Sequence, residues 1–257
     1  MSKVYFVGCG PGDPELITLK AKKLLQKADV VVYSGSLIPP QILKICKKAK
    51  MHDASGLIRE EIFDILKTGA QKNKLVIRLH DGDPAIYGAI REQTDNLHKE
   101  GIECEVVPGV TSFLASSAAL GLQLTLPGVT QTIIITRAEK RTKVPERERI
   151  SELAKHKATM IFYLSVHLLS DIVKEALRGG YSSSTPVAVV YKASWPDQKV
   201  ITGTLQDIVK KVWAEKITRT AIVMIGDVIE PKSYEYSKLY DKTFSHGYRK
   251  AKRSLIF

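Results

Sequence analysis

The sequence predicts an α/β protein of two domains, and three observations support that prediction. Short apolar runs alternate with helical patterns over roughly the first 120 residues, which is typical of a parallel sheet covered by helices. After residue 126 several apolar runs follow one another without a helix between them, which indicates a mixed sheet. The length of 257 residues is comfortable for two domains. We expect an N-terminal domain at 1–120, a C-terminal domain at 121–231 and a basic tail at 232–257.

The strands expected in the first domain are near-continuous apolar runs, the pattern of strands buried on both faces. They are residues 4–7, 30–33, 75–79 and 104–107. Helical patterns follow at residues 14–27, 39–48, 59–72, 86–100 and 112–120. This alternation predicts a mostly parallel sheet in the first domain.

The second domain is expected to hold five strands, at residues 132–136, 159–164, 187–191, 199–204 and 221–225. Its helical patterns lie at residues 147–155, 167–178 and 205–214. The link between the two domains is short, so we expect them to pack closely. A cleft between domains is the default position for a ligand site.

The composition indicates a soluble, cytoplasmic protein. Three cysteines without a CxxC pair favour a reducing compartment, and no apolar run approaches the length of a membrane span. The net charge is +12, of which the tail contributes +5. Such a charge fits either a basic surface or a polyanionic partner, which could be a small molecule with many carboxylates or a nucleic acid.

The first glycine loop follows the strand at 4–7 and reads GCGPGD from Gly8 to Asp13. Glycines let the backbone approach a ligand closely, and Asp13 before Pro14 is a typical helix start. Pro11 has no N–H to bind a pyrophosphate, and no acidic residue lies about 20 positions further on. The loop therefore indicates a ligand site that is not a dinucleotide site.

The second loop reads HDGDPAIYG from His80 to Gly88 and also follows a strand. Asp83 and Pro84 repeat the helix start of the first loop. An ordinary tight turn is the alternative interpretation. Asp81 and Asp83 could instead bind a divalent cation, but the six histidines are scattered, and we expect no metal site.

The third loop reads VVPGVTS from Val106 to Ser112 and leads into a helix of small residues. Small side chains allow close approach to a ligand or to a neighbouring element, and Thr111 is a candidate N-cap. All three loops follow strands of the first domain. Because ligands bind at the carboxyl edge of open α/β sheets, we expect the loops to form one ligand site.

Together the three loops resemble the signatures of the tetrapyrrole methyltransferase family. The resemblance extends to about residue 230 and implies that family's two-domain fold, S-adenosylmethionine as cofactor in the cleft, and a homodimer. Later segments, TQT at 130–132, TRAE at 136–139 and VVYKASWPD at 189–197, resemble family members that modify precorrins. They imply a polycarboxylate tetrapyrrole substrate, cobalt-precorrin-4, methylated at C-11, with metal-free precorrin-4 as the alternative.

The resemblance also implies site residues. Carried over to this chain, the cofactor contacts are Pro11, Asp81, Gly82, Asp83, Ile86, Thr111, Ser112, Leu164, Ala193, Thr220, Ala221 and Ile222. Cations that could bind the substrate's carboxylates are Arg137, Arg141 and Lys192. Asp81 and Tyr87 are the candidate catalytic bases, and the sequence does not choose between them.

Two other functions stay open at this point. One is an RNA methyltransferase of the same fold, which the basic charge would suit, although the second loop lacks that group's pattern after Gly-Asp. The other is a nucleic-acid-binding protein without enzymatic activity, using the aromatic and basic residues of the tail.

Overall fold

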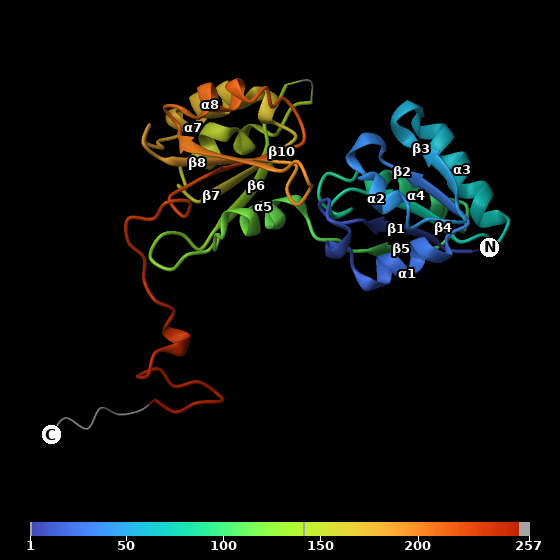
Figure 1. Cartoon of the computed structure of the whole chain (residues 1–257), viewed down its shortest axis with the longest axis horizontal. Coiled ribbons are helices and arrows are strands. Elements are labelled where there is room, and N and C mark those ends of the chain that lie inside the picture. Colours follow the sequence, from blue (N-terminus) through green and yellow to red (C-terminus); the bar gives the residue numbers. More distant parts are fainter. Residues whose placement is uncertain (1, 141, 252–257) are drawn as a thin grey trace. The chain divides into compact units, whose positions relative to one another are not determined.

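The chain forms two compact units, seen here in a computed structural model that describes residues 2–140 and 142–251 (Figure 1). The first unit extends to Leu120 and adds the segments Val190–Val200 and Ile217–Ile222. The second unit contains Gly121–Val189, Ile201–Lys216 and the chain from Val223. The first unit therefore includes two short segments from the later half of the sequence.

The first sheet has five parallel strands in the order β3-β2-β4-β1-β5. They are β1 (Val4–Gly8), β2 (Val30–Tyr33), β3 (Lys50–Asp53), β4 (Val76–His80) and β5 (Cys104–Val107). The described helices of this unit are α1 (Leu19–Lys27), α2 (Pro40–Leu43), α3 (Arg59–Gln71), α4 (Ile90–Lys99) and α5 (Ser112–Leu120). The predicted parallel sheet is thus confirmed.

Helices cover both faces of this sheet, because successive side chains of a strand point to opposite faces. Val31 packs with Leu25 of α1 and Ile42 of α2 in one core cluster. Its neighbour in the strand, Val32, packs with residues of α3 and α4 in the other, including Leu66. Burial on both faces explains why the strands read as continuous apolar runs.

Several elements differ from the sequence-based expectation, among them α2, which covers only Pro40–Leu43 of the helix predicted at 39–48. The helix predicted from residue 14 starts only at Leu19; before it lies a single turn of 3-10 helix, Pro14–Leu16, and Thr18 caps α1. The strand β3 was not predicted. Its residues are Lys-Met-His-Asp, and it lies at the edge of the sheet, where a half-exposed strand needs no apolar run.

The second sheet is mixed, as predicted, with the order β6-β7-β10-β8-β9. Its strands are β6 (Ile133–Arg137), β7 (Thr159–Tyr163), β8 (Pro186–Tyr191), β9 (Lys199–Thr204) and β10 (Ala221–Ile225). β6 runs parallel to β7, and β10 runs antiparallel to it. The accompanying helices are α6 (Ile150–Ala154), α7 (Leu169–Arg178) and α8 (Ile208–Ala214).

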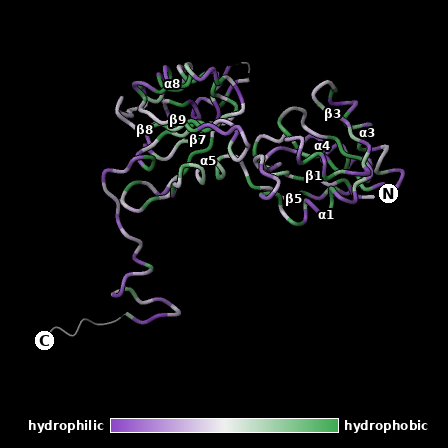
Figure 2. The backbone as a smooth tube through the Cα atoms, viewed as in Figure 1, coloured by the Kyte–Doolittle hydropathy of each residue, from purple (hydrophilic) through white to green (hydrophobic). Residues whose placement is uncertain are grey.

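The chain after β10 is mostly hydrophilic (Figure 2). It makes one backbone contact with the loop before β6, where Glu235 N donates to Pro127 O at 2.9 Å. Further on, the Arg249 guanidinium donates to the carbonyl oxygens of Leu239, Asp241 and Phe244. The Arg249 side chain therefore joins the end of this segment to residues 239–244. Among the described residues, no helix combines the length and the apolar character needed to cross a membrane.

Candidate active site

The three glycine loops lie side by side at the carboxyl edge of the first sheet. This happens because β1 lies between β4 and β5, so the loops that follow these strands are neighbours. Gly10 and Gly82 exchange two backbone hydrogen bonds, of 3.2 and 2.9 Å, which join the first loop to the second. The Asp83 Oδ2 atom accepts from Gly109 N at 2.9 Å and joins the second loop to the third.

The glycines make this contact possible in two ways. A Cβ on Gly109 would lie 2.1 Å from the Gly82 carbonyl oxygen, and a Cβ on Gly8 would lie 2.5 Å from the same atom. Only glycine fits at these two positions. Gly82 has a φ of +56°, and a Cβ there would lie 3.6 Å from Thr111 and Ser112. Glycine is therefore needed at position 82 mainly for its left-handed backbone, because 3.6 Å is an ordinary contact distance that leaves room for a Cβ.

Asp83 organises the second loop through both oxygens of its carboxylate. Oδ1 accepts from Ala85 N at 2.8 Å, which is the N-cap contact that the Asp83-Pro84 pair predicts. The helix itself starts later, at Ile90, and the intervening turn has left-handed φ angles at Tyr87 and Ala89. Such angles are costly for residues with a side chain, and they concentrate at functional sites.

Asp81 follows the buried pair of Arg78 and His80. Arg78 donates to the Val32 and Leu79 carbonyl oxygens, and burial lowers its pKa to about 10. Burial, aided by the Arg78 charge, lowers the pKa of His80 to about 3, so this imidazole is neutral near pH 7. Its Nε2 atom is buried and has no hydrogen-bond partner in the described part of the chain.

The Asp81 residue follows Arg78 and His80 in the chain and, unlike them, is exposed to solvent. Partial loss of hydration raises its pKa, and the Arg78 charge opposes that rise. The residue is nevertheless exposed, so water screens both effects. An exposed carboxylate beside the three loops could bind a cationic group of a ligand.

The first unit contains most of the residues that the resemblance singled out. Those in or beside the three loops are Pro11, Asp81, Gly82, Asp83, Ile86, Tyr87, Thr111 and Ser112. Ala193, Lys192, Thr220, Ala221 and Ile222 belong to the two later segments of the same unit. The link between these segments is a hydrogen bond of 2.9 Å from Lys192 N to Thr220 O.

Two of the three predicted substrate-binding cations, Arg137 and Lys192, have partners within the protein. The Arg137 guanidinium, in the second unit, donates to the Thr142 and Lys143 carbonyl oxygens at 2.9 and 3.0 Å. The Lys192 ammonium pairs with Asp197. Arg141 lies outside the described residues. Leu164 belongs to the second unit, where it follows β7 with a left-handed φ and is 62% exposed.

Sequence reasoning missed the contact between the first loop and Trp195. The indole Nε1 donates to Pro11 O at 2.9 Å, and Asp13 N donates to Ser194 Oγ at 3.0 Å. The motif at 189–197 contains Trp195, but it enters the sequence-based prediction only through the resemblance. The signal that could have revealed the contact is Gly12, whose lack of a side chain leaves room for a large ring.

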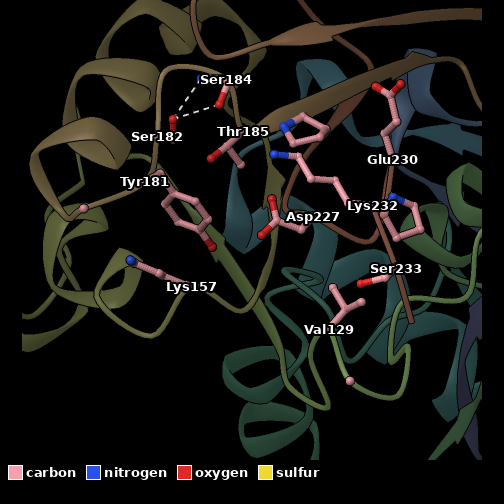
Figure 3. Close-up of a pocket in the computed structure, with 14 residues that line it drawn as sticks. Val129, Lys157, Tyr181, Ser182, Ser184, Thr185, Asp227, Glu230, Lys232 and Ser233 are labelled. Carbon is pink, nitrogen blue, oxygen red and sulfur yellow. Dashed lines mark hydrogen bonds between the residues drawn. The ribbon is translucent and has the colours of Figure 1, made fainter. Parts of the chain in front are cut away.

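A separate pocket of about 890 Å³ lies in the second unit (Figure 3). Its polar lining includes Lys157, Tyr181, Thr185, Asp227 and Lys232. The pocket lies where β7 and β8 begin and β10 ends, and it contains none of the predicted site residues. Within the described ranges, no group of three or more His, Cys, Asp or Glu side chains is arranged to hold a metal ion.

Comparison with known proteins shows the family to which the chain belongs. Residues 3–209 match the family of tetrapyrrole (corrin/porphyrin) methylases. The chain is 52% identical to a cobalt-precorrin-4 C(11)-methyltransferase of Methanocaldococcus jannaschii, over 97% of this chain and 96% of that protein. The chain therefore belongs to the tetrapyrrole methylase family. The expectation that the resemblance ends near residue 230 is wrong, because only 3% of the chain lies outside this alignment.

Two solved structures are similar to this chain over most of its length. The X-ray structure of a cobalt precorrin-4 methyltransferase, a cobalamin biosynthetic enzyme, has a TM-score of 0.85 at 44% identity and covers 89% of this chain and 96% of its own. A uroporphyrin-III C-methyl transferase from Thermus thermophilus, complexed with S-adenyl homocysteine, has a TM-score of 0.75 at 33% identity and covers 89% and 99%. The predicted two-part α/β fold of this family is thereby confirmed.

Proposed function

We propose that this protein transfers a methyl group from S-adenosylmethionine to C-11 of cobalt-precorrin-4. The observation that carries the proposal is the full-length identity of 52% to a protein named for that reaction. The site geometry supports it, because the loops of the family signature meet at one edge of the first sheet. The site residues below are part of the same proposal.

The three loops and the two later segments of the first unit fit an adenosyl sulfonium ligand. Tight glycine contacts fix the loops against one another, so their main-chain groups are rigid before a ligand arrives. The exposed Asp81 carboxylate supplies a negative charge at the same edge, which suits a sulfonium cation. We assign the cofactor to Pro11, Gly82, Thr111 and Ala193 together with their first-unit neighbours in the list above.

S-adenosylmethionine supplies an activated methyl group, so the protein needs no metal of its own for this transfer. What the chain contributes is position: holding two reactants in register can supply several kcal/mol of a reaction barrier. The Asp83 carboxylate is occupied by two backbone donors and acts as a brace of the second loop. Asp81, whose side chain reaches solvent, is the better candidate for a proton acceptor, with Tyr87 as the alternative.

The substrate's many carboxylates call for cations. Arg137 and Lys192 already have protein partners, so we assign them the role of shaping the segments that present other groups. Arg141 stays the candidate for direct contact. The proposal also includes a homodimer, and a cytoplasmic location favoured by three cysteines that are free of disulfides.

The test is methyl transfer with a labelled donor. The purified protein is incubated with ¹³C-methyl S-adenosylmethionine and either cobalt-precorrin-4 or metal-free precorrin-4, and product is analysed by mass and NMR. We expect one methyl per ring, at C-11, with faster turnover of the cobalt form. Label at another ring carbon, or label only in added ribosomal RNA, would overturn the proposal.

A further inference from the structure

The turn after β8 is fastened to the first glycine loop at two points. Trp195 Nε1 donates to Pro11 O at 2.9 Å, and Ser194 Oγ accepts from Asp13 N at 3.0 Å. Pro11 and Trp195 are 184 positions apart in the chain, yet both belong to the first unit. The two contacts lie on either side of Gly12, so the turn spans the middle of the loop.

Gly12 is the residue that admits the indole. A Cβ at this position would lie 2.1 Å from Trp195 Cδ1 and 2.4 Å from Nε1. Unlike Gly10 and Gly82, Gly12 has no left-handed φ, so its backbone makes no demand for glycine. The glycine is therefore needed for the space that the Trp195 ring occupies.

The turn is built to hold the ring in one orientation. Lys192 and Ser194 both adopt left-handed φ angles, of 46° and 68°, and Ser194 N donates to Gln198 Oε1 at 2.7 Å. The Lys192 ammonium lies 5.0 Å from the Trp195 ring centroid while it pairs with Asp197. Left-handed residues persist only where their surroundings fix them, and the cation adds attraction to the ring face.

The first loop is thereby held from two directions. Gly10 binds Gly82 of the second loop, and Pro11 and Asp13 bind the turn. Trp195 is only half-buried. Its main polar contact is with the Pro11 carbonyl, whose residue is buried.

We propose that Trp195 is a positioning residue of the cofactor site, which fixes the first loop in the conformation that binds the adenosyl ligand. This inference rests on the proposed function, because it takes the first loop as part of the cofactor site. The indole acts through Pro11 and Gly12. The chain offers a matched control, since its other tryptophan, Trp213 on α8, is 64% exposed.

The first test compares Trp195→Phe with Trp213→Phe by calorimetry with S-adenosylhomocysteine. Loss of one hydrogen bond to a buried carbonyl should raise the Kd of Trp195→Phe about 5- to 30-fold. Trp213→Phe should bind as the wild type does, and both variants should melt cooperatively. Wild-type affinity in Trp195→Phe would overturn the inference. Absence of binding by the wild type would instead count against the proposed function itself.

The second test is a double-mutant cycle between Gly12 and Trp195. Gly12→Ala alone should displace the indole and weaken binding about 10-fold or more. In a Trp195→Ala background the same change should have less than about a threefold effect, because the ring that it strikes is gone. Equal effects in both backgrounds would show that the two residues act independently, and would overturn the inference.

Fluorescence provides a readout that a purely structural role would not move. In Trp213→Phe, Trp195 is the sole indole of the chain. Addition of S-adenosylhomocysteine should change its emission with the same Kd that calorimetry gives. An unchanged emission at saturating ligand would contradict a Trp195 that is coupled to the cofactor site.

Discussion

The Asp83 carboxylate accepts a hydrogen bond from Gly109 N at 2.9 Å, and so joins two loops that follow different strands. Its other oxygen accepts from Ala85 N at 2.8 Å within its own loop. One side chain therefore fixes both the shape of the second loop and its distance from the third.

The first prediction concerns this brace. Asp83→Ala removes the acceptor of two backbone N–H groups and should lower the free energy of unfolding by about 1–3 kcal/mol. Asp83→Asn keeps one side-chain oxygen as an acceptor, so its free energy of unfolding should fall less than that of Asp83→Ala. Urea unfolding measures both. Asp95→Ala, which breaks only an exposed pair with Arg91, should cost about 0.5 kcal/mol or less; an equal cost for Asp83→Ala would contradict the brace.

The second prediction concerns space between the loops. Gly109→Ala would place a Cβ 2.1 Å from the Gly82 carbonyl oxygen, a backbone atom that cannot turn away. We expect destabilisation of about 3 kcal/mol or more, measured by thermal or urea unfolding. Gly56→Ala is the control, because no atom lies within 4 Å of its added Cβ. Near-native stability of Gly109→Ala would show that the loops are not in close contact.

The third prediction concerns pH. The pKa of His80 is about 3 in the folded protein, against 6.5 for an exposed histidine. As the pH falls below 6.5, the unfolded chain takes up this proton and the folded chain does not, so stability is present above 6.5 and is lost toward pH 3. Between pH 7 and 4.5 this loss amounts to about 2–3 kcal/mol.

His80→Phe should therefore lose correspondingly less stability than the wild type between those two pH values. The phenyl ring can keep the stacking on Phe6, whose ring centroid lies 6.0 Å from that of His80. His98→Gln, which removes a histidine at an exposed position of α4, is the control variant. Urea titrations at both pH values compare the variants, and a wild-type slope for His80→Phe would refute the assignment.

The fourth prediction concerns the segment after β10. Arg249 donates to the carbonyl oxygens of Leu239, Asp241 and Phe244, so Arg249→Ala should loosen residues 239–249 without changing the melting temperature. Chymotrypsin should then cut faster after Tyr240 and Phe244, as peptide mass mapping would report. Lys250→Ala also removes one positive charge, and chymotrypsin should cut this variant at the wild-type rate. Equal rates for the two variants would argue against the arginine's role.

Many of the helices and strands follow from local sequence patterns and could be predicted from the sequence. The bounds of β2, β5, β9 and β10 agree with the apolar runs that predicted them. The edge strand β3 could not be found in this way, because Lys50 and Asp53 at its ends are exposed. The start of α1 was placed too early, since Asp13 caps only a short turn and Thr18 caps the helix.

The site depends on relations that no local pattern contains. The loops of Gly8, Asp83 and Gly109 meet because β1 lies between β4 and β5, and strand order is a property of the whole sheet. The resemblance names the three loops and the motif at 189–197 as site segments, but it does not predict the hydrogen-bond partners of their side chains. Arg137 binds backbone carbonyls and Trp195 binds Pro11, contacts that depend on the folded chain.

Hydrogen exchange can show whether the loop edge of the first sheet binds S-adenosylmethionine. Peptides covering residues 8–13, 81–88 and 108–112 would be followed by mass spectrometry with and without S-adenosylhomocysteine. We expect slower exchange in all three peptides when the ligand is bound. Protection confined to the second unit, or unchanged exchange in the three loops at a ligand concentration that saturates binding, would contradict binding at this edge.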